Sequence, residues 1–275
     1  FYNSKFIFEV RDLWPLTPIY MKKISRWNPM IIIISKLEKI AYGSADKIVT
    51  TLENSENYIN SIIDDPQKIK HIPNGVPESF IKNKPVKSSK KTTSNKIVFT
   101  YGGSFGIANA LGPLIDFLQN QNEFSQKMEF NLIGSGYLKE QYKSRILQMD
   151  NVYIEEKMER GAFINKLKES DVAFISWMDL PGLYKYGVSA QKYYDYMATG
   201  TPILSAQNGI NDPVRQSGCG IIVKNEPEEI KKGIYQFLSM SKSEREKMGE
   251  KGREYVKAFS YERLSKKYIQ LFDSL

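Results

Sequence analysis

Short apolar segments alternate with amphipathic segments along the 275-residue chain. The apolar segments are rich in β-branched and aromatic residues, which is typical of buried strands. Because strands that alternate with helices form parallel sheets with helices on both faces, the pattern predicts an α/β fold with Rossmann-like layers. The expected strands lie at residues 5–10, 47–51, 68–72, 97–101, 130–133, 152–154, 172–175, 202–205 and 220–223.

A polar segment divides this alternation in two. Residues 82–95 hold many Lys, Ser and Thr and little that could be buried, so we expect a solvated linker there. The sequence therefore predicts a first domain over 1–81, a second over 96–258 and a last helix over 259–275. Because the chain opens directly on a strand, we expect the first domain to be incomplete.

Composition excludes several kinds of site. One Cys and one His leave neither an intramolecular disulfide nor a Cys/His zinc cluster, so no metal is expected. The longest apolar run, Met30 to Ile34, is far shorter than the roughly 20 residues of a membrane span, so we expect no membrane-spanning segment. The single cysteine fits a reducing compartment, and we expect a cytoplasmic protein. The net charge of +8 favours a polyanionic partner such as nucleic acid, anionic lipid or a phosphorylated small molecule.

The most informative segment runs from Tyr186 to Pro202. Ser189 is expected to cap the start of a helix that Gly200 ends. Free N–H groups at the helix start attract anions, and Lys192 adds a positive charge one turn later. Asp195 falls on the same side, where a carboxylate can accept two hydroxyls of a vicinal diol. The pattern indicates a nucleotide site, with an ordinary Lys–Asp surface pair as an equal alternative.

Two glycine turns follow expected strands. In the segment from Thr100 to Gly106, glycines let the backbone turn tightly and approach a ligand, but no P-loop Gly-Lys-Ser/Thr follows. Gly134-Ser135-Gly136 is a weaker signal of the same kind. A plain strand-to-helix turn explains either segment equally well.

The segment from Gly187 to Pro202 resembles the donor-binding segment of family 4 glycosyltransferases, in particular a branch found in bacterial surface-polysaccharide (lipopolysaccharide and capsule) enzymes. Ala190 stands where that branch has proline. The resemblance extends over nearly the whole chain, because further motifs stand in the family's order. They are Phe8-Glu9-Val10-Arg11-Asp12-Leu13-Trp14-Pro15, Ala45-Asp46-Lys47-Ile48, Ile72-Pro73-Asn74-Gly75-Val76, Tyr101-Gly102-Gly103, Ser170-Asp171-Val172-Ala173 and Gly252-Arg253-Glu254-Tyr255-Val256.

The resemblance implies a GT-B fold, in which two Rossmann-like parallel-sheet domains face a cleft and a last helix, here Tyr261 to Phe272, packs back on the first domain. It implies a retaining hexosyl- or N-acetylhexosaminyltransferase. The donor would be a nucleotide diphosphate sugar such as a UDP-sugar, and the acceptor a growing or polyprenyl-linked glycan. The nucleotide sugar is then a substrate, and no cofactor or metal is required. A peripheral position on the inner face of the cell membrane would suit such an acceptor.

The family's residue roles carry over by position. Asp195 would hold the donor ribose, Lys192 and the Ser189 region the diphosphate, and the segment Glu156-Lys157-Met158 the base. The expected catalytic residues are Arg11, Asp12 and Lys192, and the expected donor-binding residues are Gly102, Gly103, Ser104, Met158, Gly187, Val188, Ser189, Gln191, Lys192 and Asp195.

Besides Ala190, the chain departs from the family pattern at three positions. Gly187 stands where many members have Glu, and Ser104 and Asn109 stand where many have Arg and Lys. These departures leave open which sugar is bound and how the leaving phosphate is neutralised.

Two other functions compete. A nucleotide-sugar 2-epimerase-like isomerase would need acid–base groups, and the one histidine, His71, is expected to be structural. A non-catalytic basic module could bind anionic lipid or nucleic acid through the basic residues between Lys22 and Lys39, which surround an apolar patch. Because no helix-turn-helix pattern or aromatic platform accompanies them, no nucleic-acid partner is expected.

Overall fold

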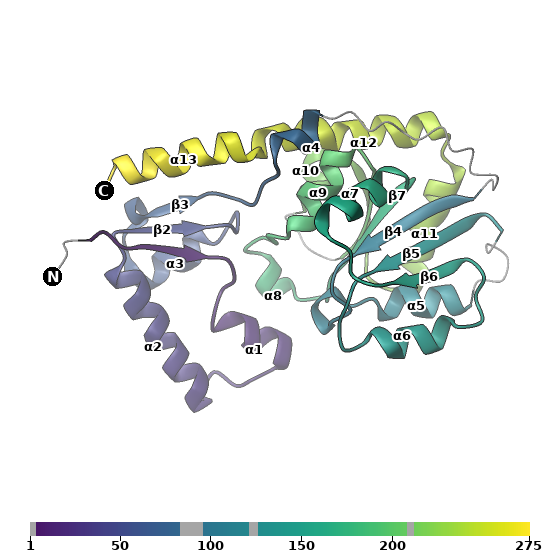
Figure 1. Cartoon of the computed structure of the whole chain (residues 1–275). Helices are drawn as coiled ribbons and strands as arrows, with labels where there is room; N and C mark the ends of the chain where they lie inside the picture. The colour runs from purple at the N-terminus through teal and green to yellow at the C-terminus, as the bar shows by residue number, and fades with distance from the viewer. Residues whose placement is uncertain (1–3, 83–95, 121–125, 208–211) are drawn as a thin grey trace.

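The computed structural model describes residues 4–82, 96–120, 126–207 and 212–275 (Figure 1). Its strands form two parallel sheets, one of three strands in the order β1-β2-β3 and one of six in the order β6-β5-β4-β7-β8-β9. Each expected strand is present within two residues of its expected bounds, which confirms the α/β class. The strands are β1 Ile7–Val10, β2 Lys47–Thr50, β3 Ile69–His71, β4 Ile97–Gly102, β5 Met128–Ile133, β6 Val152–Glu155, β7 Val172–Ser176, β8 Ile203–Ala206 and β9 Gly220–Val223.

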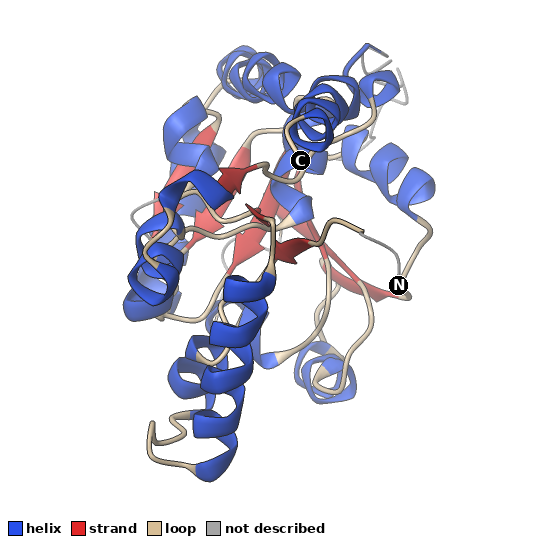
Figure 2. Ribbon diagram, turned by 90° about the vertical axis from the view of Figure 1, so that its left-hand side faces the viewer, coloured by secondary structure: helices blue, strands red, loops and turns tan. Residues whose placement is uncertain are grey.

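Helices connect these parallel strands and cover the sheets (Figures 1 and 2). The expected linker 82–95 lies outside the described residues apart from Lys82, which ends α4. The helices are α1 Leu16–Lys22, α2 Pro29–Ser44, α3 Glu56–Ile63, α4 Glu78–Lys82, α5 Gly112–Gln119, α6 Lys139–Ile146, α7 Arg160–Lys168, α8 Pro181–Tyr184, α9 Gln191–Thr199, α10 Pro213–Ser217, α11 Pro227–Ser239, α12 Lys242–Val256 and α13 Tyr261–Asp273.

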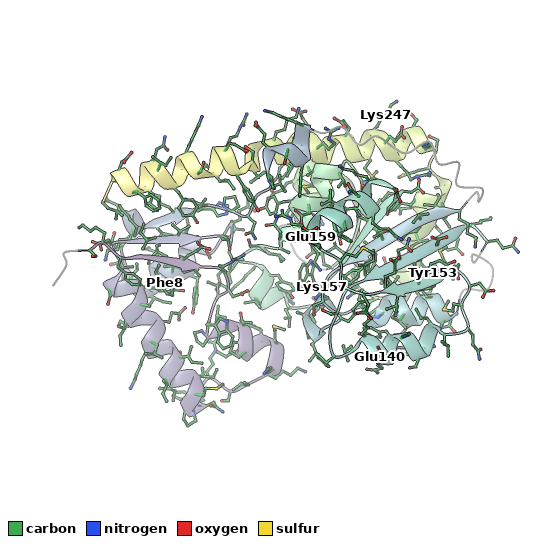
Figure 3. The ribbon with its side chains drawn as sticks, in the orientation of Figure 1. Phe8, Glu140, Tyr153, Lys157, Glu159 and Lys247 are labelled. Atoms are coloured by element: carbon green, nitrogen blue, oxygen red, sulfur yellow. The ribbon has the colours of Figure 1, made fainter. Side chains whose placement is uncertain are left out.

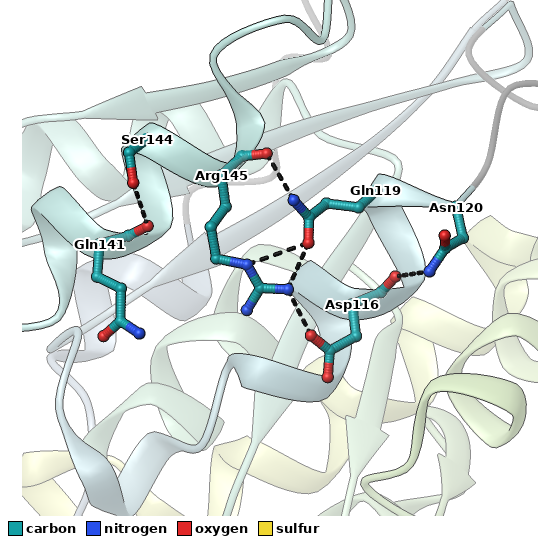
Figure 4. A network of polar contacts seen from close by, with 6 residues as sticks. All are labelled: Asp116, Gln119, Asn120, Gln141, Ser144 and Arg145. Carbon is teal, nitrogen blue, oxygen red and sulfur yellow. Dashed lines mark hydrogen bonds and ion pairs between the residues drawn. The ribbon is translucent and has the colours of Figure 1, made fainter.

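Aromatic packing builds the core of the larger sheet. The rings of Phe99 and Phe130, on neighbouring strands β4 and β5, stack with their centres 4.8 Å apart. Phe237 of α11 meets Phe99 edge-on, so the sheet and its covering helix share one core. At the surface, Arg145 of α6 binds Asp116 of α5 at 2.5 Å and fastens the two helices together (Figure 4).

Helix α13 crosses from the larger sheet to the smaller one (Figure 1). Its buried residues Leu264 and Leu271 pack against Val49 and Ile72, which belong to the smaller sheet and the residue after it. The helix therefore connects the larger sheet to the smaller one.

Candidate nucleotide site

A cavity of about 470 Å³ opens where β4, β5 and β6 end, on the side of the larger sheet that faces the smaller one. Figure 3 shows Lys157 and Glu159, from the loop after β6, on that side. Ligands of open parallel sheets bind at such carboxyl ends. The residues that line the cavity are Gly102, Gly103, Ser104, Ile133, Gly134, Ser135, Lys157, Met158, Arg160, Phe163, Gln191, Lys192 and Asp195.

Two glycine turns, at Gly102-Gly103 and at Gly134, form one wall of the cavity. The backbones are so close there that a larger residue would not fit at Gly134. A Cβ atom on Gly134 would lie 1.8 Å from the carbonyl oxygen of Gly103, so the two turns touch through their backbones. The Tyr196 hydroxyl of α9 accepts a hydrogen bond from the Gly102 N–H at 2.8 Å and donates to its carbonyl oxygen at 3.1 Å. Helix α9 thus fixes the first turn in place.

Lys192 reaches this wall from α9. Its Nζ atom donates to Asn109 Oδ1 at 2.5 Å and lies over the rings of Trp177 and Tyr101, at 4.5 and 5.1 Å from their centres. Burial lowers the pKa of the Lys192 ammonium to about 7. An anionic ligand would favour the protonated form and restore the charge.

Asp195 also lines the cavity, but its partner is not Lys192. The guanidinium of Arg160 donates to both carboxylate oxygens, from Nη2 at 2.6 Å and from Nε at 3.2 Å. Gln191 Nε2 adds a hydrogen bond to Asp195 Oδ1 at 3.1 Å. The Asp195 side chain is buried and pairs with Arg160, so the alternative of an ordinary Lys–Asp surface pair is wrong.

Three expected donor-binding residues lie elsewhere. Gly187 and Val188 line a separate cavity of about 80 Å³ that also contains His71. Ser189 does not cap α9, which begins at Gln191 with no side-chain cap. The N-cap residue of α9 is Ala190, so Ser189 lies one residue too early, and its Oγ accepts a hydrogen bond from Asn74 Nδ2 at 2.7 Å. The structure thus places these three against the segments that follow β2 and β3 of the smaller sheet, and their contact with a donor stays a prediction.

Arg11 and Asp12 follow β1 and line a different cavity, of about 320 Å³. Both are exposed, and Arg11 Nε lies 3.9 Å from Glu9 Oε1. Trp14 lines the same cavity and is half exposed. The structure does not bring Arg11 and Asp12 to Lys192, and their catalytic role stays a prediction.

Sequence reasoning missed Arg160 and treated Asn109 only as a departure from the family pattern. Arg160 comes two residues after the expected base segment 156–158 and begins α7, so a cation between a strand end and a helix was the available signal. Asn109 gives no comparable signal, because its contact with Lys192 joins residues that are far apart in the chain.

Two absences hold for the part of the chain that the structure describes. There, no three His, Cys, Asp or Glu side chains gather as ligands for a metal ion. Likewise, no helix in the described ranges combines the length and the apolar character that a bilayer span needs.

Residues 113–270 match a family model described as "Glycosyl transferase-like". A curated relative, an uncharacterized glycosyltransferase of Methanocaldococcus jannaschii, is 25% identical over 250 residues, which are 86% of this chain and 60% of the relative. The chain thus spans about three fifths of the length of the curated relative that it matches.

Solved structures share the fold. Sucrose-phosphate synthase from Thermosynechococcus elongatus has a TM-score of 0.75 at 16% identity, over 100% of this chain and 69% of that one. HepE of Anabaena in complex with UDP-glucose has a TM-score of 0.75 at 15% identity, over 99% and 73%. WaaG, a glycosyltransferase involved in lipopolysaccharide biosynthesis, has a TM-score of 0.72 at 14% identity, over 96% and 74%. With a family model that covers more than half of its residues and this fold, the chain belongs to the glycosyl transferase-like family, group 1 of the GT-B glycosyltransferases.

Proposed function

We propose that this protein transfers a sugar, with retention of configuration, from a nucleoside diphosphate donor such as a UDP-sugar to a hydroxyl of a lipid-linked or growing glycan. One observation carries the proposal: Asp195 and Lys192 of α9 line the same cavity. A carboxylate can accept the two hydroxyls of a ribose, and an ammonium group can meet a diphosphate. HepE of Anabaena, which shares the fold, has been solved with UDP and with UDP-glucose, which supports a uridine nucleotide.

Catalysis would rest on electrostatic stabilisation of the leaving diphosphate. The leaving diphosphate gains negative charge in the transition state, and groups already in place to receive that charge lower the barrier. Lys192 and the backbone N–H groups at the start of α9 supply positive charge from one direction. We therefore expect donor binding to persist when divalent metals are chelated.

Calorimetric titration and thermal shift of the 275-residue chain with UDP, GDP, ADP and CMP test the donor site. We expect UDP to raise the melting temperature most, with and without EDTA. A matched control is Lys166→Ala, because Lys166 pairs with Glu155 outside the cavity and should leave UDP binding unchanged. Absence of a shift with every nucleotide contradicts the proposal.

Product analysis tests the reaction itself. Release of UDP from UDP-glucose should rise when a polyprenyl-linked glycan is added. The anomeric signal of the product in NMR should match that of the donor, and an inverted signal would contradict retention.

We further propose that α2 and the loop before it meet the anionic inner face of the cell membrane, where a polyprenyl-linked acceptor resides. Helix α2 projects from the smaller sheet (Figures 1 and 2). Trp27 is 86% exposed, and Ile33 and Leu37 are exposed on α2. Lys36 and Lys39 are exposed on the same helix. Each such cation contributes about 1 kcal/mol near an anionic surface.

Sedimentation with phosphatidylglycerol vesicles tests this surface. Binding should be strong at low salt and weak at high salt, and Lys36→Glu combined with Lys39→Glu should abolish it. The control Lys166→Glu, on the other domain, should bind like the unchanged protein. No sedimentation at low salt would rule the membrane contact out.

A further inference from the structure

Arg160 forms an ion pair with Asp195, and Asp195 is the carboxylate that our proposed function assigns to the donor ribose. The planar guanidinium forms two parallel hydrogen bonds, so both oxygens of the carboxylate are engaged. Gln191 takes a further position on Oδ1. A carboxylate has about four acceptor positions, and these three hydrogen bonds leave one, on Oδ2. A vicinal diol therefore docks with both hydroxyls only if Arg160 or Gln191 gives up a hydrogen bond to Asp195.

Arg160 is the member of the pair that can move. Its side chain is 37% exposed, while that of Asp195 is 9% exposed and sits in the middle of a helix. The other contacts of Arg160 are weaker than the ion pair. Its Nη1 donates to the Tyr261 hydroxyl at 3.2 Å, and its guanidinium lies 5.3 Å from the centre of the Phe80 ring.

The cost of this displacement depends on the charge of the ligand. A neutral nucleoside offers hydroxyls to Asp195 but leaves the guanidinium without a counter-charge in a partly buried cavity. A nucleoside diphosphate brings at least two negative charges into the same cavity, where Arg160 can pair with them. Arg160 therefore weakens the binding of neutral nucleosides but not that of nucleoside diphosphates.

We propose that Arg160 determines specificity by closing Asp195 to neutral diols and releasing it to ligands that carry phosphate. The inference rests on the proposed function for the identity of the ligand. Selectivity for the diphosphate would then arise at two places. One is Lys192, and the other is Asp195, for which Arg160 and the ribose hydroxyls compete.

Calorimetric titration of the unchanged protein and of Arg160→Gln with uridine, UMP and UDP tests the proposal. The glutamine keeps a hydrogen-bond donor for Asp195 and removes the charge. We expect uridine to bind roughly tenfold more tightly to the variant, in line with the loss of one charged hydrogen-bond competitor, and UDP to bind no more tightly than before. The ratio of UDP affinity to uridine affinity should therefore fall at least tenfold.

A matched control separates competition from structural support. Tyr261→Phe removes the contact on the other side of the guanidinium and keeps the ion pair, so its affinity ratio should equal that of the unchanged protein. If Arg160→Gln does not fold, Arg160→Lys keeps the charge but loses the two-pronged contact, and we expect a smaller fall in the ratio.

The outcomes are distinguishable. Equal weakening of uridine and UDP in the Arg160 variants shows a structural role and overturns the inference while the donor site stands. An unchanged ratio in a folded variant overturns it as well. Failure of UDP to bind the unchanged protein overturns the proposed function together with this inference.

Discussion

The side-chain nitrogen of Lys192 lies 4.5 Å from the centre of the Trp177 ring, and Trp177 is held there by a hydrogen bond from its indole N–H to the Tyr193 hydroxyl at 2.9 Å. Lys192 and Tyr193 are neighbours on α9, so this helix both carries the lysine and fixes the aromatic ring above it. Asn109 is the hydrogen-bond acceptor of the ammonium group. The lysine is thus positioned and largely desolvated before any ligand arrives.

Replacement of this lysine should affect charged ligands selectively. We expect Lys192→Met to weaken UDP binding by roughly tenfold or more, because a hydrogen bond to a charged group contributes about 1.5–3 kcal/mol. Uridine, which has no phosphate, should bind about as well as before. Titration of UDP and uridine, with Lys166→Met as the control, checks this; equal losses for both ligands would show that the lysine supports structure only.

The ribose contact of Asp195 can be tested by changing the ligand and the protein together. The unchanged protein should bind UDP more tightly than 2′-deoxy-UDP, because the deoxy ligand lacks one of the two hydroxyl donors. Asp195→Asn keeps one acceptor oxygen and loses the charge, so the preference for UDP should shrink and UDP should bind at roughly a tenth of its original affinity. If the full preference for UDP persists in the variant, another residue holds the ribose.

The parallel sheets were predictable because each strand is a short apolar run between amphipathic helices, and that pattern is local in the sequence. The cavity was partly predictable for a related reason. Glycines after a strand and charged residues on one helix face are local patterns, and Gly102, Gly103, Lys192 and Asp195 do line one cavity.

The site features that the sequence did not predict depend on contacts between residues that are far apart in the chain. Ser189 satisfies the local rule for a helix cap, yet Ala190 is the N-cap residue, and Asn74, 115 residues away in the chain, donates a hydrogen bond to the Ser189 hydroxyl. Arg160 and Asp195 are 35 residues apart, so no spacing rule could pair them. Such tertiary contacts are not encoded in local sequence patterns.

Because the two glycine turns are in close contact, a single added methyl group at Gly134 should lower the stability of the fold. Gly134→Ala places a Cβ atom against the Gly103 carbonyl oxygen, and backbone must shift to make room. We expect a loss of about 1–3 kcal/mol in the free energy of unfolding, together with weaker UDP binding. Gly43→Ala, in α2 with nothing within 4 Å of the new atom, should instead stabilise by up to about 1 kcal/mol. Urea denaturation compares the two, and equal effects would contradict the prediction.

The lowered pKa of Lys192 predicts a pH-dependent stability. Between about pH 7 and its ordinary value of 10.5, the unfolded chain binds a proton at this lysine and the folded chain does not. The free energy of unfolding should therefore contain a term that rises with pH across this window and is flat below it. Lys192→Met removes that term, which urea denaturation at several pH values would detect as a smaller slope.

The same pKa predicts proton uptake on ligand binding. At pH 8.5 the free lysine, with a pKa of about 7, is mostly neutral, and a bound diphosphate should restore its proton. Binding of UDP should then take up about one proton at this pH and weaken as the pH rises further. Calorimetric titration in buffers of different ionisation enthalpy measures this uptake directly. Lys192→Met should show none, and uptake that is equal in both proteins would place the titrating group elsewhere.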